Sequence, residues 1–297
     1  MSQDILAGID IGSNAIRLLI NNIEATGKGA DFKKTAYLRV PIRLGEDVFT
    51  RGEISEEKKE RLINAMQGFS YIMKAFCVNE YRACATSAMR DASNGTEIVS
   101  AILNESGIDI KIIDGQTEAD IIYQAGGLYD VMDKDRTYLY VDVGGGSTEV
   151  VVYSNQKKLT SRSFQLGTVR MLVDAVTDEE RNEFKLWLKE IYEQYAPLGI
   201  VASGGNINKI HKLLGKRERE ILTYTELKVL YDALSDLTYE ERIQAFKLNP
   251  YRADVIVPAL KIFLTVTKIC KINDINVPKV GLVDGIVKQL YKERNQK

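Results

Sequence analysis

Two glycine-containing turns carry the residues best suited to chemistry in this chain. The first follows Asp10 and contains Gly12 and Ser13, and the second follows Asp142 and reads Gly-Gly-Gly-Ser over residues 144–147. Backbone N–H groups in such turns are not shielded by side chains, and several of them facing one concavity bind an anion. Aspartate oxygens are also the ligands that Mg²⁺ prefers when it bridges phosphates. The two turns therefore predict a clamp for phosphate groups.

Each turn connects two apolar runs whose composition predicts β-strands. The runs are Ile5–Ile11 and Ala15–Ile23 in the first half, and Tyr138–Val143 and Thr148–Tyr153 in the second. Both halves open with a strand, a Gly-Ser turn and a second strand, so the chain contains a weak internal repeat. The repeat predicts two similar α/β lobes that face each other.

Strand and helix patterns alternate along the rest of the chain. After Ser55, apolar residues from Leu62 to Phe76 recur every three or four positions, which predicts a helix with one buried stripe. Pro258 predicts a kink or a late helix start, because proline cannot donate a hydrogen bond to the carbonyl of Asp254. The other predicted elements are strands Tyr81–Thr86 and Ile110–Ile113 and helices Thr96–Glu105, a helix from about Thr117, Glu179–Tyr195, Asn206–Leu214, Thr225–Leu237, Arg252–Ile269 and Val283–Lys292.

Length and composition set the number of domains and exclude several classes of protein. The 297 residues, 45% hydrophobic and 27% charged, indicate two core-forming domains, which we expect over 1–125 and 126–297, with a break near Gly126-Gly127 and the final helix able to pack on the first domain. The formal net charge of -1 lacks the basic field that nonspecific nucleic-acid binding uses. Neither a membrane-length apolar stretch nor a signal peptide is evident. We expect a cytoplasmic protein without nucleic-acid or membrane partners.

The scarcity of histidine and cysteine narrows the chemistry further. His211 is the only histidine, which argues against a multi-histidine metal site, and we expect it to be solvated. The three cysteines, Cys77, Cys84 and Cys270, are too scattered for a zinc cluster or a disulfide framework. We expect them to be small buried side chains.

Several ordered motifs resemble the exopolyphosphatase/guanosine pentaphosphate phosphohydrolase family over nearly the whole chain. They are Ala7-Gly-Ile-Asp-Ile-Gly-Ser-Asn-Ala-Ile-Arg-Leu18, Ala83-Cys-Ala-Thr-Ser-Ala-Met-Arg-Asp-Ala-Ser-Asn94, Ile112-Ile-Asp-Gly-Gln-Thr-Glu-Ala119, Val141-Asp-Val-Gly-Gly-Gly-Ser-Thr-Glu149, Leu166-Gly-Thr-Val-Arg-Met171, Arg252-Ala-Asp-Val-Ile256 and Gly281-Leu-Val-Asp-Gly285. The resemblance implies an α/β fold of the actin, sugar kinase and chaperone ATPase superfamily, with two ribonuclease-H-like domains around a central cleft. It also implies a hydrolase that removes terminal phosphate from inorganic polyphosphate or guanosine pentaphosphate.

The same resemblance assigns roles to individual residues. Glu118 matches the catalytic carboxylate that positions the attacking water, and Arg90 matches the arginine that neutralises the terminal phosphate. Asp142 matches the metal-ligating aspartate, with Glu149 and Asp10 as further acidic residues around Mg²⁺. Substrate phosphates would be held by Gly12, Ser13, Asn14, Arg17, Gly144, Gly145, Gly146, Ser147 and Thr148. Arg170 and Arg252 are as compatible with a structural role as with a functional one.

The sequence departs from the family pattern in two places. Many members have two adjacent acids before the alanine of the catalytic motif, whereas here Thr117 replaces the first of them, and we expect a lower activity. Long members continue into a helical His-Asp type domain, and we expect this chain to be a short, two-domain member.

Other functions remain open at this stage. A sensor that binds guanosine polyphosphates or polyphosphate without turnover, or an ATPase or sugar kinase of the same superfamily, would use similar turns. Ala202–Asn206 is either a nucleoside contact or only a strand-to-helix turn. Basic residues at Lys33-Lys34, Arg39, Arg43 and Lys216–Arg219 either guide a polyanion or form solvated faces. A homodimer is the commonest closed assembly and the default expectation.

Overall fold

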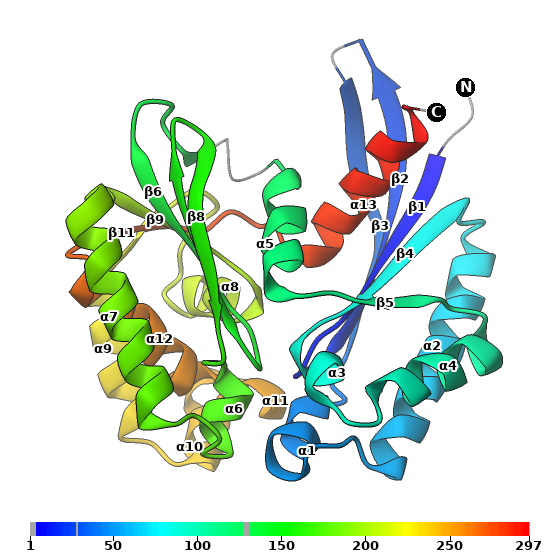
Figure 1. Cartoon of the computed structure of the whole chain (residues 1–297), viewed down its shortest axis with the longest axis horizontal. Coiled ribbons are helices and arrows are strands. Elements are labelled where there is room, and N and C mark those ends of the chain that lie inside the picture. Colours follow the sequence, from blue (N-terminus) through cyan, green and yellow to red (C-terminus); the bar gives the residue numbers. More distant parts are fainter. Residues whose placement is uncertain (1–3, 28, 127–130, 297) are drawn as a thin grey trace. The chain divides into compact units, whose positions relative to one another are not determined.

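The computed structural model describes residues 4–27, 29–126 and 131–296 (Figure 1). The chain divides into two compact units, one made of Met1–Ala125 with Leu282–Lys297 and the other of Gly126–Gly281. The final helix thus belongs with the first unit. Gly127, half of the predicted break, lies outside the described residues.

The first unit is built on a five-stranded sheet with the order β3-β2-β1-β4-β5. Strand β1 pairs antiparallel with β2 and parallel with β4, so the opening hairpin lies in the middle of the sheet. Its elements are β1 (Asp4–Ile11), β2 (Ile16–Thr26), β3 (Gly29–Val40), α1 (Leu44–Arg51), α2 (Glu56–Ala75), β4 (Glu80–Ala85), α3 (Ser87–Asp91), α4 (Gly95–Ser106), β5 (Ile110–Ile112), α5 (Gly115–Gln124) and α13 (Leu282–Arg294).

Both faces of this sheet are covered, because alternate residues of its central strands are apolar on each side. Ala7, Ile9 and Ile11 of β1 join one cluster with the buried stripe of α2, which begins at its N-cap Ser55 as predicted. Leu6 and Leu19 join a second cluster with α13, drawn in red along β1 and β2 in Figure 1. The last helix of the chain therefore closes the core of the first unit.

The second unit repeats this plan around a six-stranded sheet with the order β10-β11-β9-β6-β7-β8. Strand β6 pairs antiparallel with β7 and parallel with β9, as β1 does with β2 and β4. Its elements are β6 (Thr137–Val143), β7 (Thr148–Ser154), β8 (Lys157–Phe164), α6 (Thr168–Leu172), α7 (Asp178–Tyr195), β9 (Gly199–Ser203), α8 (Gly205–Leu213), β10 (Leu222–Thr223), α9 (Tyr224–Ser235), α10 (Tyr239–Phe246), α11 (Pro250–Ala253), α12 (Ile256–Ile269) and β11 (Asp274–Asn276).

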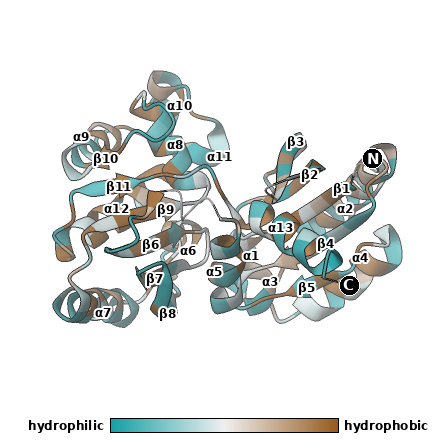
Figure 2. Cartoon of the chain, turned by 90° about the horizontal axis from the view of Figure 1, so that it is seen from above, coloured by the Kyte–Doolittle hydropathy of each residue, from teal (hydrophilic) through white to brown (hydrophobic). Residues whose placement is uncertain are grey.

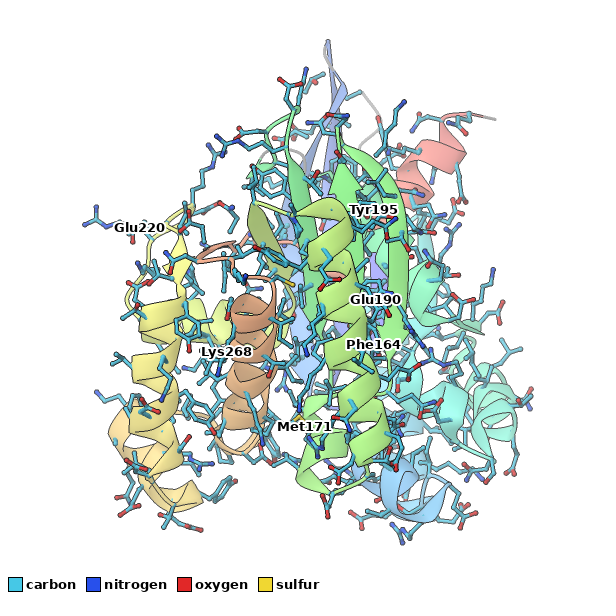
Figure 3. The ribbon with its side chains drawn as sticks, turned by 60° about the vertical axis from the view of Figure 1, so that its left-hand side comes forward. Phe164, Met171, Glu190, Tyr195, Glu220 and Lys268 are labelled. Atoms are coloured by element: carbon cyan, nitrogen blue, oxygen red, sulfur yellow. The ribbon has the colours of Figure 1, made fainter. Side chains whose placement is uncertain are left out.

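The helices of the second unit bury their apolar residues against its sheet. Figure 3 shows α7, which carries Glu190 and Tyr195, next to α12, which carries Lys268. Phe164 at the end of β8 packs edge-on against Phe184, with ring centroids 4.9 Å apart. In Figure 2 the residues of α12 are mostly brown, the colour of hydrophobic residues, whereas α7 carries both brown hydrophobic and teal hydrophilic residues. This difference fits a buried helix and an amphipathic one.

The predicted fold class, α/β with two ribonuclease-H-like units, is confirmed, as are both opening hairpins. Pro258 lies in the first turn of α12 and a break separates α11 from α12, so the late start is correct. The catalytic-motif helix begins at Gly115 rather than near Thr117, because the Asp114 side chain caps it by accepting from the Thr117 amide. Within the described residues, every helix is too short or too polar to span a bilayer.

Candidate phosphate-binding site

The two predicted turns have the same backbone geometry. In the first unit the amide of Gly12 donates to the carbonyl of Ala15 at 3.2 Å, which closes residues 12–15. In the second unit the amide of Gly144 donates to the carbonyl of Ser147 at 2.9 Å, which closes residues 144–147. Each turn follows a strand that ends one residue after an aspartate, which is Asp10 in β1 and Asp142 in β6. The internal repeat thus extends to individual hydrogen bonds.

In the first unit, the beginning of α1 holds the turn from one side. The amide of Gly45 donates to the Ser13 carbonyl at 2.8 Å, and the amide of Arg43 donates to the Asn14 carbonyl at 3.1 Å. A β-carbon on Gly45 would lie 3.0 Å from the Ser13 β-carbon and 2.6 Å from the Phe49 ring, so glycine permits this approach.

In the second unit, α6 holds the other turn in the same way. The amide of Val169 donates to the Gly145 carbonyl at 2.8 Å, and Arg170 Nε donates to the Gly146 carbonyl at 2.9 Å. A β-carbon on Gly167 would lie 2.4 Å from the Gly145 carbonyl oxygen, which again requires glycine. The Leu-Gly pairs at 44–45 and 166–167 are the sequence signal of this shared support. Only the second pair lies in one of the motifs identified from the sequence.

Anchoring the carbonyls fixes the direction of the amides. A trans peptide points its N–H opposite to its C=O, so the amides that follow the held carbonyls face away from α1 and α6. Among the described residues, the amides of Gly145, Gly146 and Ser147 donate to no partner. Consecutive amides of this kind form a concave site for an anion.

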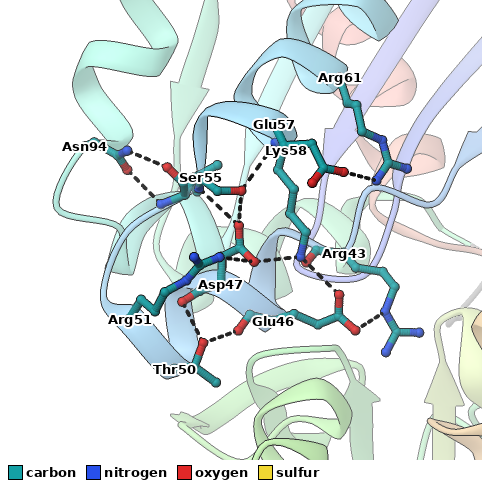
Figure 4. Close-up of polar contacts among 11 residues, drawn as sticks. Arg43, Glu46, Asp47, Thr50, Arg51, Ser55, Glu57, Lys58, Arg61 and Asn94 are labelled. Carbon is teal, nitrogen blue, oxygen red and sulfur yellow. Dashed lines mark hydrogen bonds and ion pairs between the residues drawn. The ribbon is translucent and has the colours of Figure 1, made fainter.

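A network of charged side chains holds α1 against α2 (Figure 4). Lys58 Nζ donates to the carbonyl of Arg43 at 2.7 Å and pairs with Glu46 at 3.0 Å and Asp47 at 2.9 Å. Asp47 also accepts from the Ser55 amide at 3.0 Å. Because the Arg43 amide contacts the turn directly, this network also holds the turn that carries Ser13 and Asn14.

Asp47 should make the stability of the first unit depend on pH. Burial alone would raise the pKa of the Asp47 carboxyl, but hydrogen bonds from Ser55 and Lys58 outweigh it and lower the pKa to about 2. Since this folded-state pKa lies below the ordinary value of about 3.9, the stabilisation is complete above about pH 4 and is lost as the pH falls toward the folded-state value. The difference amounts to about 2 kcal/mol.

We expect Asp47→Asn to lose about 2 kcal/mol of unfolding free energy at neutral pH. Urea denaturation of the wild type and the variant at a series of pH values measures the gap, which should narrow as the medium becomes acidic below about pH 4. A gap of the same size at every pH would contradict this role for the carboxylate.

The side chains of the first turn lie among groups that tie it to its neighbours. Ser13 Oγ accepts from the amide of Ala88 at 3.2 Å, and the carboxylate of Asp10 pairs with Arg17. The buried Oδ1 of Asn14 and Oγ of Ser87 have no hydrogen-bond partner among the described residues. Polar atoms of this kind are costly to bury unless something binds them. The first unit thus gathers the predicted residues Asp10, Gly12, Ser13, Asn14 and Arg17.

Two acidic side chains face each other beside the second turn. Asp142 and Glu149 are direct partners across β6 and β7, and they are 8% and 2% exposed. Asp142 Oδ2 accepts from Ser203 Oγ at 3.3 Å, and Glu149 Oε1 accepts from Ser163 Oγ at 2.9 Å. Like charges directly opposite one another destabilise a sheet unless a cation offsets them. This pair is a suitable donor set for a divalent metal.

Magnesium fits that donor set in chemistry and in number of ligands. It usually takes one or two carboxylates from the protein and completes its shell with water and substrate phosphates. Among the described residues, no three His, Cys, Asp or Glu side chains cluster as a metal centre made by protein alone would require. Asp10, the third predicted metal ligand, has its carboxylate paired with Arg17.

The predicted catalytic residues Glu118 and Arg90 come together at the start of α5. Glu118 lies in the first turn of this helix. Arg90 Nη1 donates to the carbonyl of Ile113 at 2.9 Å, next to the N-cap Asp114. Burial raises the pKa of the Cys84 thiol to about 11, and Asp10 and Glu118 are among the charges that act on it. Glu118 and Arg90 thus belong to the same end of α5.

The other predicted residues of the second unit have internal partners. Thr148 Oγ1 donates to the Leu166 carbonyl at 2.5 Å, and Arg170 supports the turn through the Gly146 carbonyl. Arg252 Nη1 donates to Asn206 Oδ1 at 2.9 Å. Ala202–Asn206 contains the turn between β9 and α8. Gly204 in this turn contacts Asp142, a role that the sequence did not indicate.

Two expectations about single residues are wrong. His211 is 6% exposed rather than solvated, because its ring nitrogen Nε2 bonds to the Glu220 carbonyl at 2.8 Å. Cys77 is exposed, whereas Cys84 and Cys270 are buried as predicted. Cys77 follows the end of α2 with a φ of 54°, where the chain turns outward before β4.

Comparison with curated proteins gives three relatives with phosphatase names. The chain is 29% identical to a bifunctional 3-dehydroquinate synthase/phosphatase of Fusobacterium nucleatum over 84% of its length and 41% of the relative's. It is 26% identical to a guanosine-5'-triphosphate,3'-diphosphate pyrophosphatase of Photobacterium profundum, over 97% of its length and 59% of the relative's. It is 24% identical to exopolyphosphatase 1 of Mycobacterium bovis, over 95% of its own length and 87% of the relative's. The chain thus spans about half the length of the first two relatives.

Solved structures and family models agree with these relatives. The crystal structure of the Aquifex aeolicus member of the Ppx/GppA protein family is similar to this chain with a TM-score of 0.79 and 27% identity, over 100% of both chains. The model of the Ppx/GppA phosphatase family matches residues 23–294. The chain therefore belongs to the Ppx/GppA phosphatase family.

Proposed function

We propose that this protein is a hydrolase that removes the terminal phosphate from linear phosphoanhydrides, either inorganic polyphosphate or guanosine pentaphosphate. The observation that carries the proposal is the repeated turn. Hydrogen bonds from α1 hold the carbonyls of the first turn and those from α6 hold the carbonyls of the second, which leaves the turn amides pointing away from these helices and available to an anion. Relatives named exopolyphosphatase and guanosine pentaphosphate pyrophosphatase support the substrate class.

In the proposed reaction, Glu118 orients a water molecule and accepts its proton as the water oxygen attacks the terminal phosphorus. The bond between that phosphorus and the bridging oxygen breaks, and the shortened phosphate chain leaves. Charge spreads over the phosphoryl oxygens in such reactions, so positioning and electrostatic stabilisation supply most of the rate. Arg90, anchored on the Ile113 carbonyl, offsets charge on the terminal phosphate.

Asp142 and Glu149 are the residues that we propose to hold Mg²⁺. When bound, the ion would neutralise charge on the phosphoryl oxygens. The chain's own contribution is to keep both carboxylates in place with hydrogen bonds from Ser203 and Ser163. Buried acids fixed in this way need little reorganisation when the ion and the substrate arrive.

Phosphate release from polyphosphates of defined length and from guanosine pentaphosphate tests the proposal. We expect release from at least one of these substrates in Mg²⁺, loss of release after chelation with EDTA, and recovery when Mg²⁺ is restored. Equal rates with and without the chelator would contradict the metal assignment. Stabilisation of the protein by these ligands without any product would instead identify a sensor.

A further inference from the structure

In each sheet, a row of directly paired residues runs across three neighbouring strands, from the strand before the turn to the edge strand. In the first unit the row is Asp10 of β1, Arg17 of β2 and Arg39 of β3. Paired neighbours of this kind lie on the same face of a sheet. The row therefore extends the phosphate-binding region of the first unit by one strand, from Arg17 to Arg39.

The equivalent row in the second unit has the opposite charge. There it consists of Asp142, Glu149 and Ser163. The repeat thus places two arginines in the first unit where the second unit has an acid and a hydroxyl. A basic row suits direct contact with phosphate, whereas an acidic row suits contact through a cation.

Arg39 is the arginine of this row that forms no ion pair with a carboxylate in the part of the chain that the structure describes. Arg17 pairs with Asp10, and Arg43 pairs with Glu46 at 2.6 Å. The Nε and Nη2 atoms of Arg39 are buried and have no hydrogen-bond partner among the described residues. Burial and the positive charges of Arg17 and Arg43 lower the pKa of the Arg39 guanidinium, although Tyr37 opposes this effect.

Such an arrangement is unfavourable for the protein alone. A half-buried guanidinium with two buried, unused donors carries part of the desolvation penalty of a charged group, and two nearby cations add repulsion. An anion would satisfy the donors and offset the charge at the same time. The planar fork of arginine matches the oxygens of a phosphate group, which it can bind through two parallel hydrogen bonds.

The turn lies close enough to share a ligand with this row. A β-carbon on Gly12 would lie 3.6 Å from Arg17 Nη1, so the Arg17 side chain borders the turn. Arg39 is the cross-strand neighbour of Arg17 on the side away from Asp10. A chain of phosphates that starts at the turn would therefore pass Arg17 before it reaches Arg39.

We propose that Arg39 forms a second anion subsite of the first unit, which binds a phosphoryl group farther along a phosphoanhydride chain than the group held at the turn. The inference rests on the proposed function for its choice of ligand. Arg39 acts in binding and takes no part in bond cleavage.

Binding of tripolyphosphate, measured by calorimetry in a Glu118→Gln background, tests the subsite without turnover. We expect Arg39→Met to weaken binding by about tenfold or more, because charge-assisted hydrogen bonds to phosphate are lost. Lys74→Met is the matched control, since Lys74 is an exposed residue of α2 in the same unit and its loss changes the charge equally. The control should change binding by less than about twofold.

A second measurement separates a binding role from a structural one. If Arg39 serves a ligand, Arg39→Met should leave the melting temperature of the ligand-free protein unchanged or raise it, because an unpaired buried charge is removed. A clear fall in that temperature together with unchanged tripolyphosphate affinity would overturn the proposal. Arg39→Lys keeps the charge and the apolar stem, and should still lose affinity because it lacks the planar fork.

Other outcomes distinguish this proposal from the proposed function. If the wild type binds tripolyphosphate through Arg39 but releases no phosphate, the hydrolase assignment fails and the subsite stands. Equal affinity of the Arg39→Met and Lys74→Met variants for tripolyphosphate overturns the subsite whether or not the protein is a hydrolase. A loss confined to guanosine pentaphosphate would also overturn it, because recognition would then depend on the nucleoside.

Discussion

Replacing Glu118 by Gln should lower the rate of phosphate release by about 10²- to 10⁴-fold, the usual contribution of a general base. Glutamine has nearly the same shape as glutamate and can still hold a water molecule, but it cannot accept the proton. Because the proposed role of Glu118, in the first turn of α5, is to accept a proton in the transition state and not to hold the substrate, the loss should fall on kcat more than on KM. Phosphate release under single-turnover and steady-state conditions measures it.

The control for this variant is another glutamate at the start of a helix in the same unit. Glu57 lies in the first turn of α2, and its side chain is 81% exposed. Glu57→Gln loses the same favourable interaction with the helix dipole, about 0.3–1 kcal/mol, and should keep full activity. A folded Glu118→Gln protein with nearly wild-type turnover would rule out the catalytic assignment.

Replacing Gly204 by Ala should damage both stability and magnesium dependence. Gly204 has φ 96° and ψ 170°, a backbone region that is open essentially to glycine alone, so the strain costs about 1–3 kcal/mol. The added β-carbon would lie 2.3 Å from Asp142 Oδ1 and must displace that carboxylate. If Asp142 holds Mg²⁺, the displacement should weaken the metal site about 10- to 100-fold.

Urea denaturation and phosphate release over a range of Mg²⁺ concentrations measure the two effects of Gly204→Ala. Gly215→Ala is the matched control, because Gly215 has φ 70° but open space around its missing β-carbon. That variant should lose stability through backbone strain while its magnesium dependence stays as in the wild type. A Gly204→Ala protein that loses stability but keeps the wild-type magnesium dependence would contradict the assignment of Asp142 as a magnesium ligand.

The sequence predicted those parts of the fold that depend on neighbours along the chain. The apolar runs on either side of each turn predicted strands, and the spacing from Leu62 to Phe76 predicted a helix with one buried stripe. The stripe is buried from Leu62 to Met73, but Phe76 is the C-cap residue of α2 and is exposed, so that last position was wrong. The edge strand β3 was missed because its exposed positions carry polar residues such as Lys33 and Lys34. No strong apolar alternation marks such a strand.

The candidate site shows the same division. The Asp and Gly-Ser elements at 10–13 and 142–147 were visible as a repeat, and so were the motif residues Glu118 and Arg90. The support of each turn by α1 or α6 was not visible, because it joins residues more than twenty positions apart through backbone amides. Backbone hydrogen bonds of this kind leave little trace in residue type except for the two Leu-Gly pairs.

The amino-acid sequence by itself determined the repeated hairpins, the glycine turns and the chemistry that their side chains make available. Only the tertiary structure decided that α13 closes the first core, that Gly204 contacts Asp142, and that Arg39 lies beside Arg17 without a carboxylate. The physical reason is the distance along the chain over which each kind of interaction acts. Helix periodicity and turn geometry arise within a few residues, whereas strand register and close backbone approach depend on how distant segments pack together.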